Sequence, residues 1–206
     1  MTEGVPQPNE TERMSYAVFE KAGRYMTKVA ARLQRAAASL EDAHIPYAVI
    51  GGNAVMSWVA RADETAIRPT QDVDILLERS RLDQAKKALE TVGFHYRHVA
   101  SIDMFLDGPE GKAREAIHVI FAGELVRPDY LLPAPQLAET TRSPENFSIL
   151  SLQALVRMKL TSYRLKDQVH LQDLVSVGLV TSAWLDGRYP PVLEERLKRI
   201  LDNPEA

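Results

Sequence analysis

The chain has 206 residues, of which 45% are hydrophobic and 26% are charged. This composition is typical of a globular protein and excludes a mostly disordered chain, a collagen and a disulfide-rich miniprotein. The 25 Lys and Arg residues are outnumbered by 28 Asp and Glu residues, and the net charge of -3 gives no general basic surface for nucleic acid. Because the sequence has no cysteine, disulfides, thiolate zinc sites and cysteine nucleophiles are excluded.

No stretch of the sequence reaches the roughly 20 apolar residues that a membrane-spanning helix needs. The N-terminal segment has early acidic residues and prolines in place of the apolar region of a secretory signal. We therefore expect a cytoplasmic protein that does not bind a membrane. Residues 1–14 are expected to form a flexible N-terminal arm.

The first regular elements follow this arm. Apolar residues recur at helical spacing from about residue 15 to 43 and predict an amphipathic helix that covers a sheet. The next segment, YAVI over residues 47–50, has the pattern of a short buried strand. The glycine pair at 51–52 then forms a sharp turn, and Asn53 is predicted to cap a helix that runs to about Ala60.

Strands dominate the middle of the chain. The segment DVDILLE over residues 72–78 predicts a strand, and Ser80 is expected to cap a helix that ends at Gly93. Three further segments, FHYRHV, SIDMFLD and REAIHVIFA, each have the pattern of a strand.

The composition changes in the last third of the chain. Prolines recur over residues 124–146 and predict a connection that wraps around the core, followed by a short strand in FSIL. Ser151 is expected to start a helix, a second helix ends at Gly178, and two short helices begin near Thr181 and at the proline pair 190–191.

We therefore predict an α/β (α+β) fold with a small mixed sheet flanked by helices. Residues 15–123 would form the core, residues 124–150 the proline-bearing connection, and residues 151–206 a helical C-terminal part packed on the core.

The pattern Asp72-Val73-Asp74 places two carboxylates on one face of the predicted strand, because residues two apart point the same way. Two like charges at this distance repel unless water, a cation or an arginine lies between them. Such a carboxylate pair suits Mg²⁺, which proteins bind through one or two carboxylates together with substrate phosphates. The alternative is a solvated strand end with two surface acids.

The strand, glycine turn and helix around Gly51 and Gly52 present free backbone amides at a helix N-terminus, which favours phosphate binding. The sequence contains neither the dinucleotide-binding fingerprint nor a Walker A loop. The alternative is a tight turn in which only glycine fits.

Together, Ile50-Gly51-Gly52 and Asp72-Val73-Asp74-Ile75 combine a phosphate-binding turn with an acidic pair on the next strand. In these residues the chain resembles the nucleotidyltransferase superfamily, which has the polymerase-beta-like fold. The longer pattern IGGNAVMSW…IRPTQDVDILL looks most like the AbiEii-type nucleotidyltransferases of toxin–antitoxin and phage-defence systems. The resemblance implies an NTP substrate and Mg²⁺ (or Mn²⁺) held by Asp72 and Asp74.

The C-terminal third extends this resemblance. Lys159, Arg164, Lys166 and Asp167 occupy the positions of a lysine and an R-x-K/R-D run in that family. The resemblance implies that Lys159 neutralises the triphosphate and that the other three belong to the nucleotide site. If the stretch is one helix, Lys159, Tyr163 and Lys166 share a face. The alternative is a solvated basic face.

One position departs from the superfamily pattern, in which a later strand supplies a third carboxylate. In this sequence the matching residue is His118, and imidazole is a poor ligand for Mg²⁺. His118 is therefore expected either to act as a general base for the acceptor hydroxyl or to leave a site that binds nucleotide with little turnover. A third alternative is an ordinary core or surface histidine, and Asp103 is a candidate replacement for the carboxylate.

Two loop residues complete the expected nucleotide site. Thr70 lies two residues before Asp72, so its hydroxyl is a candidate phosphate contact, although a plain strand-start threonine is an alternative. Arg68 is a candidate for reaching the phosphates, and an exposed loop arginine is its alternative. Asn53 joins this set because it follows the glycine turn.

The function expected from these residues is Mg²⁺-dependent transfer of a nucleoside monophosphate from an NTP to an acceptor hydroxyl. The acceptor is a tRNA, a protein or a small molecule, and a cognate antitoxin is a candidate partner protein. The alternative function is a catalytically weak module of the same fold that binds nucleotide or protein.

Overall fold

The structure, a computed structural model, describes the backbone of residues 10–203 and the side chains of residue 23 and residues 26–203. Residues 1–9, most of the expected arm, lie outside this range. The helices are α1 (Glu10–Asp42), α2 (Gly51–Ala62), α3 (Leu82–Thr91), α4 (Leu152–Ser162), α5 (Leu165–Ser176) and α6 (Pro191–Asp202). The strands are β1 (Tyr47–Ile50), β2 (Val73–Leu77), β3 (Phe94–Val99), β4 (Ile102–Asp107), β5 (Ile117–Phe121), β6 (Thr140–Arg142) and β7 (Ser148–Leu150).

All the described strands form one mixed sheet in the order β3-β4-β5-β2-β1-β7-β6. The pairs β2/β5 and β1/β7 are parallel, and the other neighbouring pairs are antiparallel. The predicted α/β fold with a mixed sheet flanked by helices is therefore confirmed. Within residues 10–203, every helix is too short or too polar to span a membrane.

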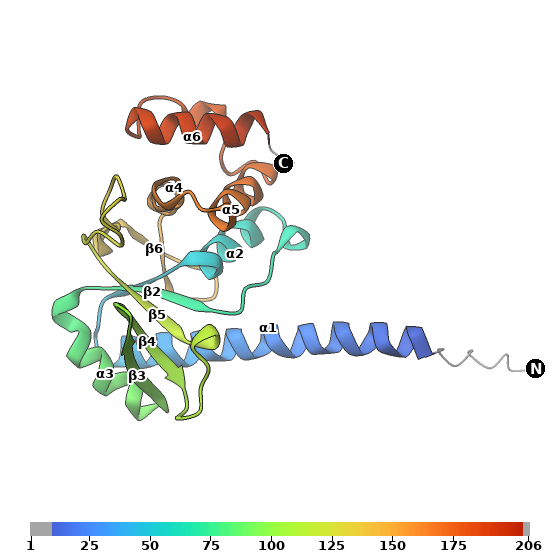
Figure 1. Cartoon of the computed structure of the whole chain (residues 1–206), viewed down its shortest axis with the longest axis vertical. Helices are drawn as coiled ribbons and strands as arrows, with labels where there is room; N and C mark the ends of the chain where they lie inside the picture. Colours follow the sequence, from blue (N-terminus) through green and yellow to red (C-terminus); the bar gives the residue numbers. More distant parts are fainter. Residues whose placement is uncertain (1–9, 204–206) are drawn as a thin grey trace, which may run out of the picture.

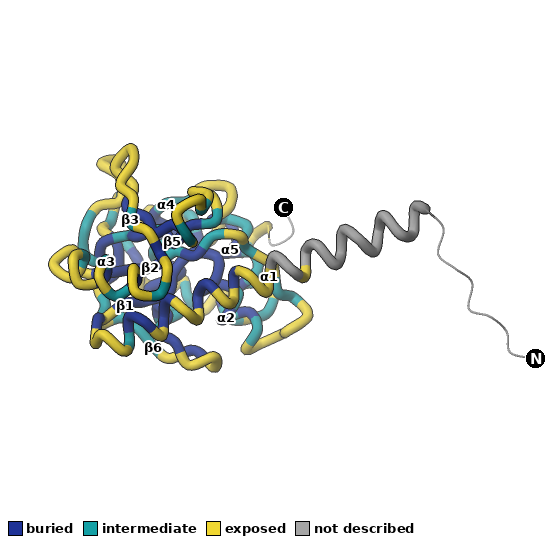
Figure 2. The backbone as a smooth tube through the Cα atoms, turned by 90° about the horizontal axis from the view of Figure 1, so that it is seen from below, coloured by how far each residue is buried: buried dark blue, intermediate teal, exposed yellow. Residues whose placement is uncertain are grey.

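Helices cover both faces of the sheet (Figure 1). One core joins α1 and α3 to alternate strand residues such as Val73, Ile75 and Leu77. The second core joins α2, α4, α5 and α6 to the opposite face, including Ile50 and Leu76. The buried segments of β1 and β2 lie at the centre of the body (Figure 2). The second face also carries the acidic pair, so the candidate site lies on this face.

The largest differences from the predicted elements concern helix starts. Helix α1 begins at Glu10 rather than near residue 15, which agrees with the preference of acidic residues for a first helical turn. Asn53 is not a cap, because α2 begins at Gly51, whose φ of 66° lets the chain turn directly from β1 into the helix. Ser80 is not a cap either, since a 3₁₀ turn over Arg79–Arg81 precedes α3.

One further difference lies in the C-terminal part. Strand β6 was not expected, because its three residues pair with β7 at the sheet edge and are too few to show a pattern. The two helices predicted between Ser151 and Gly178 are present as α4 and α5, and Tyr163 separates them with a left-handed φ of 47°, so Lys159 and Lys166 do not share the face of a single helix. Ser151 caps α4 as predicted, and its hydroxyl accepts a hydrogen bond from the Ala154 amide.

The packing of α1 on the sheet gives a stability prediction. The variant Leu40→Ala should lower the free energy of unfolding by about 2–5 kcal/mol, because Leu40 is fully buried and its truncation leaves a cavity. Urea unfolding measures this loss. The matched control Leu165→Ala removes a side chain that is 81% exposed and should change stability by less than about 0.5 kcal/mol. Equal losses in the two variants would contradict the packing described for α1.

Candidate active site

The acidic pair lies at the start of β2, in the middle of the sheet. Asp72 precedes the strand and Asp74 lies within it, on the face opposite the buried Val73 and Ile75. Asp74 is in register with Ile50 of the antiparallel β1 and with His118 of the parallel β5. The sheet therefore places the acidic pair between the glycine turn and the histidine.

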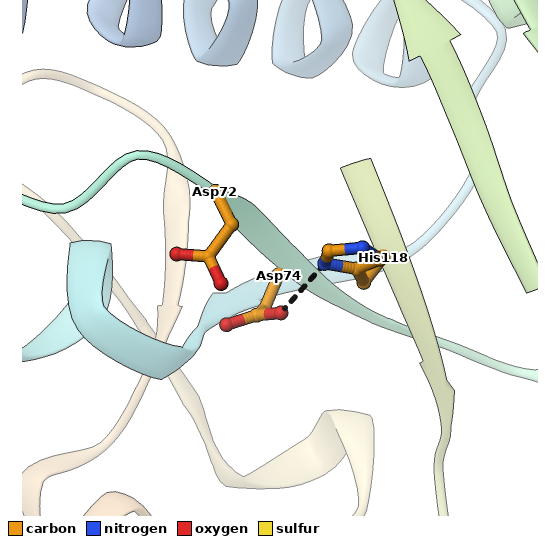
Figure 3. Close-up of side chains that lie close together, drawn as sticks. All are labelled: Asp72, Asp74 and His118. Carbon is orange, nitrogen blue, oxygen red and sulfur yellow. Dashed lines mark ion pairs between the residues drawn. The ribbon is translucent and has the colours of Figure 1, made fainter. Parts of the chain in front are cut away.

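The side chains of Asp72, Asp74 and His118 converge (Figure 3). One ligand atom from each residue lies within 4.8 Å of the others, and His118 Nδ1 is 3.5 Å from Asp74 Oδ1. Each side chain is about a quarter exposed, between 23% and 26%. The three donors are therefore held together and still reachable from solvent.

The imidazole of His118 has a defined orientation. Its Nε2 lies 3.0 Å from the carbonyl oxygen of Ala113. Because a carbonyl only accepts hydrogen bonds, Nε2 carries a proton and donates, which leaves Nδ1 directed at Asp74. The interaction with Asp74 raises the pKa of His118, although burial opposes this shift.

Asp72 is held by several neighbours. The Thr70 hydroxyl donates to Asp72 Oδ1 at 2.6 Å, and Lys166 Nζ lies 3.6 Å from the same oxygen. Asn53 Nδ2 donates to the backbone carbonyl of Asp72 at 2.7 Å. Burial alone would raise the pKa of Asp72, but the hydrogen bond from Thr70 and the charge of Lys166 lower it below its usual value. Asp72 is therefore kept ionised.

Gly51 and Gly52 approach the acidic pair and Thr70 closely, and we call this turn the glycine cradle. A Cβ atom at Gly51 would lie 2.0 Å from Asp74 Oδ2, and one at Gly52 would lie 3.0 Å from the Thr70 hydroxyl. Helix α2 starts here without a side-chain cap, so its first amides stay available. The glycines thus allow carboxylate and backbone to approach, and they leave a helix N-terminus at the site.

The junction of α4 and α5 is fixed by a buried carboxylate. Asp167, whose side chain is 1% exposed, accepts hydrogen bonds from Lys159 at 2.9 Å, and from Arg164 and Ser162 at 2.7 Å. Burial alone would raise the pKa of Asp167, but Arg164 and Lys159 hold it well below its usual range. The Lys159 ammonium is therefore engaged in a buried ion pair, whereas Lys166 is 56% exposed and faces Asp72.

A cavity of about 540 Å³ opens in front of the three converging residues. This volume lies in the range of small-molecule sites. The lining comes from the glycine turn, the acidic pair, β5, the β3–β4 tip, the loop 126–134 and the α4–α5 region. Of the predicted site residues it includes Gly51, Gly52, Asp72, Asp74, His118, Lys159, Arg164, Lys166 and Asp167.

Three predicted site residues lie outside the cavity lining. Thr70 and Asn53 hold Asp72, as described above. Arg68 forms two hydrogen bonds of 3.0 Å with Asp173 on α5. This ion pair turns the guanidinium to α5 rather than to the cavity.

Asp103 does not replace the third carboxylate. It is in register with Val119, the neighbour of His118 on β5, and so lies on the opposite face of the sheet. There it is buried and accepts hydrogen bonds from Tyr96 and His98. Strand alternation around β5 therefore excludes Asp103 from the cluster.

Sequence reasoning missed the wall formed by the β3–β4 tip and the loop 126–134, which includes Ser101, Ile102 and Tyr130. Ala100 and Ser101 both have positive φ at this tip, without glycine or asparagine to mark the turn. No local signal in the sequence could have assigned these residues to the cavity, because their place depends on the order of the strands.

Two solved structures share the arrangement of this chain. The crystal structure of ANT(2")-Ia in complex with adenylyl-2"-tobramycin superposes with a TM-score of 0.54 and 14% identity, over 84% of this chain and 98% of that one. A nucleotidyltransferase-like protein from Paracoccidioides brasiliensis superposes with a TM-score of 0.51 and 17% identity, over 86% of this chain and 88% of that one. The chain has a nucleotidyltransferase-like fold. Comparisons by sequence, with protein families and with curated proteins, find no match.

The cluster in this nucleotidyltransferase-like fold fits a divalent cation. Asp72 and Asp74 supply carboxylate oxygens and His118 supplies an imidazole nitrogen, all of which are common metal ligands. The glycine cradle supports this assignment, since it keeps the Asp74 carboxylate in place without a side chain in front of it.

The cradle gives a testable prediction. Gly51→Ala should lower the free energy of unfolding by about 1–2 kcal/mol, because alanine is strained at positive φ. The clash between the added Cβ and Asp74 should lower it further. The control Gly178→Ala has a similar φ of 75° but open space around the added Cβ, so it should show the strain alone. Chemical unfolding of both variants measures the difference. Equal losses would contradict the close approach of Asp74 to the turn.

His170, which lines the cavity beside the α4–α5 junction, gives a pH prediction. Burial and the charges of Lys159 and Lys166 lower the pKa of His170 to about 4, and its buried Nδ1 has no hydrogen-bond partner among the described residues. The unfolded chain therefore binds more protons than the folded one between about pH 4 and 6.5, so stability should rise with pH across this window.

The lowered pKa of His170 should change the free energy of unfolding by about 3 kcal/mol across this pH window. Each unit of difference between the folded and unfolded pKa corresponds to about 1.4 kcal/mol. Urea unfolding at several pH values should give a flatter curve for His170→Gln than for the wild type. His95→Gln, at an exposed position, is the control and should keep the wild-type slope. An unchanged slope in His170→Gln would show that His170 is not buried as a neutral imidazole.

Proposed function

We propose that the chain transfers a nucleoside monophosphate from an NTP to an acceptor hydroxyl, with Mg²⁺ or Mn²⁺ as cofactor. The observation that carries the proposal is the convergence of Asp72, Asp74 and His118 beside a glycine turn and a helix N-terminus. These residues open into a cavity of about 540 Å³ within a nucleotidyltransferase-like fold.

The phosphates are assigned to the wall formed by α2 and α5. The free amides at Gly51 and Gly52 suit phosphate oxygens, and the exposed ammonium of Lys166 lies beside Asp72. Lys159 has a different part in this proposal, because its ion pair with Asp167 holds the α4–α5 junction from which Arg164 and Lys166 project. Arg68 is left out of the nucleotide site because Asp173 engages it.

In the proposed reaction, the acceptor oxygen forms a bond to the α-phosphorus while the bond to the β-phosphate oxygen breaks. Pyrophosphate leaves, and the hydroxyl proton passes to the surrounding water. A bound divalent cation would supply charge stabilisation at the reacting phosphoryl group. Asp72 and Asp74 would hold that cation. The Thr70 hydroxyl helps to keep Asp72 ionised, and Asn53 fixes the backbone of Asp72 through its carbonyl oxygen.

The acceptor is assigned to the opposite wall of the cavity. Once the phosphates occupy the α2 and α5 side, the β3–β4 tip and the loop 126–134 remain for the acceptor. The related fold of ANT(2")-Ia holds adenylyl-2"-tobramycin, an adenylylated small molecule. A small-molecule hydroxyl is therefore one acceptor class to test, beside a tRNA end and a protein side chain.

The resemblance of the glycine and aspartate pattern to AbiEii-type nucleotidyltransferases supports a role in a toxin–antitoxin or defence system. In that role a cognate antitoxin would be the partner protein. The proposal places the reaction in the cytoplasm, where NTPs are available.

A second function is favoured by one observation. His118 stands where the superfamily pattern has a carboxylate, and it faces Asp74 at 3.5 Å. If this pair keeps a cation out, the protein is a nucleotide-binding or protein-binding module with little turnover.

Nucleotide transfer can be tested with each of four α-labelled NTPs, with Mg²⁺ or Mn²⁺ and three acceptors: total tRNA, tobramycin and the protein itself. The wild type should label one acceptor class. The double variant Asp72→Asn/Asp74→Asn should lose more than about 100-fold of this activity, since even residues that only support metal ligands cost about 10–100-fold. The control Asp83→Asn changes a carboxylate whose side chain is 88% exposed, and it should keep full activity.

Three outcomes separate the alternatives. Label that survives in the double variant would contradict the roles of Asp72 and Asp74. No label, with a metal-dependent rise of the melting temperature on adding NTP, would support the binding module. The absence of both effects would contradict a nucleotide site in this cavity.

A further inference from the structure

We infer that His118 is a nitrogen ligand of the cation and that the site therefore prefers a first-row transition-metal ion, such as Mn²⁺ or Co²⁺, over Mg²⁺. This deepens the proposed function and rests on it for the nature of the site. Three features of the site point to a nitrogen ligand: the anchoring of the imidazole, the spacing of the three donors and their chemistry.

The anchoring of His118 is that of a metal ligand. The 3₁₀ turn over Ala113–Glu115 folds back before β5 and brings the Ala113 carbonyl within 3.0 Å of Nε2. Histidines that bind metals almost always donate their second ring N–H to a carbonyl or carboxylate, which fixes the ring and directs the free nitrogen at the metal. In His118 the nitrogen left free is Nδ1, and it faces the two carboxylates.

The spacing of the donors leaves room for an ion. His118 Nδ1 and Asp74 Oδ1 are 3.5 Å apart, longer than the usual 2.7–3.2 Å of an N–H···O hydrogen bond. Two ligands bound about 2.1 Å from one ion lie about 3 Å apart when they are adjacent in an octahedron. Asp72 contributes the third donor within the same 4.8 Å limit. The cluster is therefore close to the size of a coordination shell.

The chemistry of the three donors determines which metal ions the site prefers. Carboxylate oxygens suit both Mg²⁺ and Mn²⁺, whereas imidazole suits transition metals. A site of two carboxylates and one imidazole therefore favours Mn²⁺ and Co²⁺ over Mg²⁺ more strongly than an all-oxygen site does. The phosphates of a nucleotide would fill further positions with oxygen, without removing the nitrogen.

Pulsed EPR on Mn²⁺ bound to the full chain tests the nitrogen ligand directly. The protein is first freed of metal with a chelator, and the spectra are recorded without nucleotide in a nitrogen-free buffer. We expect modulation from a ¹⁴N nucleus coupled to Mn²⁺ in the wild type and in His95→Asn, whose side chain lies outside the cluster. The modulation should be lost in His118→Asp.

Calorimetry gives a second readout that is independent of catalysis. The ratio of Co²⁺ to Mg²⁺ affinity should fall at least about 10-fold in His118→Asp, since oxygen replaces nitrogen in the ligand set. The variant His118→Asn, which is uncharged, repeats the EPR test if the aspartate variant fails to fold. The wild-type spectrum alone shows whether ¹⁴N is coupled to Mn²⁺, even if neither variant folds.

The inference is overturned if wild-type protein binds no Mn²⁺, if the bound Mn²⁺ shows no ¹⁴N coupling, or if the affinity ratio is unchanged in His118→Asp. Nucleotide transfer with Mg²⁺ in any of these cases would leave the proposed function intact. The reverse result, ¹⁴N coupling without transfer to any acceptor, would uphold the ligand and contradict the proposed function.

Discussion

Two carboxylates on one face of a central strand are the constraint on which the site depends. Asp72 and Asp74 are about three-quarters buried, so the surrounding residues must accommodate two acidic side chains on the same face of one strand. The Thr70 hydroxyl and the Lys166 ammonium meet Asp72, and the His118 imidazole lies 3.5 Å from Asp74. The same crowding explains the glycine at 51, since any side chain there would displace the Asp74 carboxylate.

The C-terminal helices belong to this arrangement and do not merely cover the core. A buried ion pair is strongly destabilised when one partner is removed, and Lys159 with Asp167 forms such a pair at the junction of α4 and α5. This junction sets where α5 begins, and therefore where Lys166 meets Asp72. Apolar residues from β1, β2 and α2 share one buried cluster with those of α4, α5 and α6. Packing thus couples the C-terminal helices to a candidate site whose three converging residues lie in the first two-thirds of the chain.

The sequence predicted most of this fold because its signals are local. Strand alternation placed Asp72 and Asp74 on one face, and turn residues marked most element boundaries. The register of β5 then explains why His118, and not Asp103, meets them, but this follows from strand order, which no local pattern encodes. Asn53 and Arg68 were assigned to the nucleotide from their place in the chain. Their contacts with the Asp72 carbonyl and with Asp173 span 19 and 105 residues and could not be derived from spacing.

In the proposed function, the charge of the candidate site would link nucleotide binding to cation binding. A triphosphate would enter a cavity that already holds two carboxylates, and Lys166 is the described ammonium that lies beside them and is more than half exposed. Lys166, together with an Arg164 that already pairs with Asp167, cannot offset both the carboxylates and the phosphates. A bound cation should therefore strengthen nucleotide binding, and the nucleotide should strengthen cation binding by the same factor. The His118 imidazole fits this balance, because it adds a third donor to the cluster without the formal negative charge that a third carboxylate would bring, and so it would repel a triphosphate less.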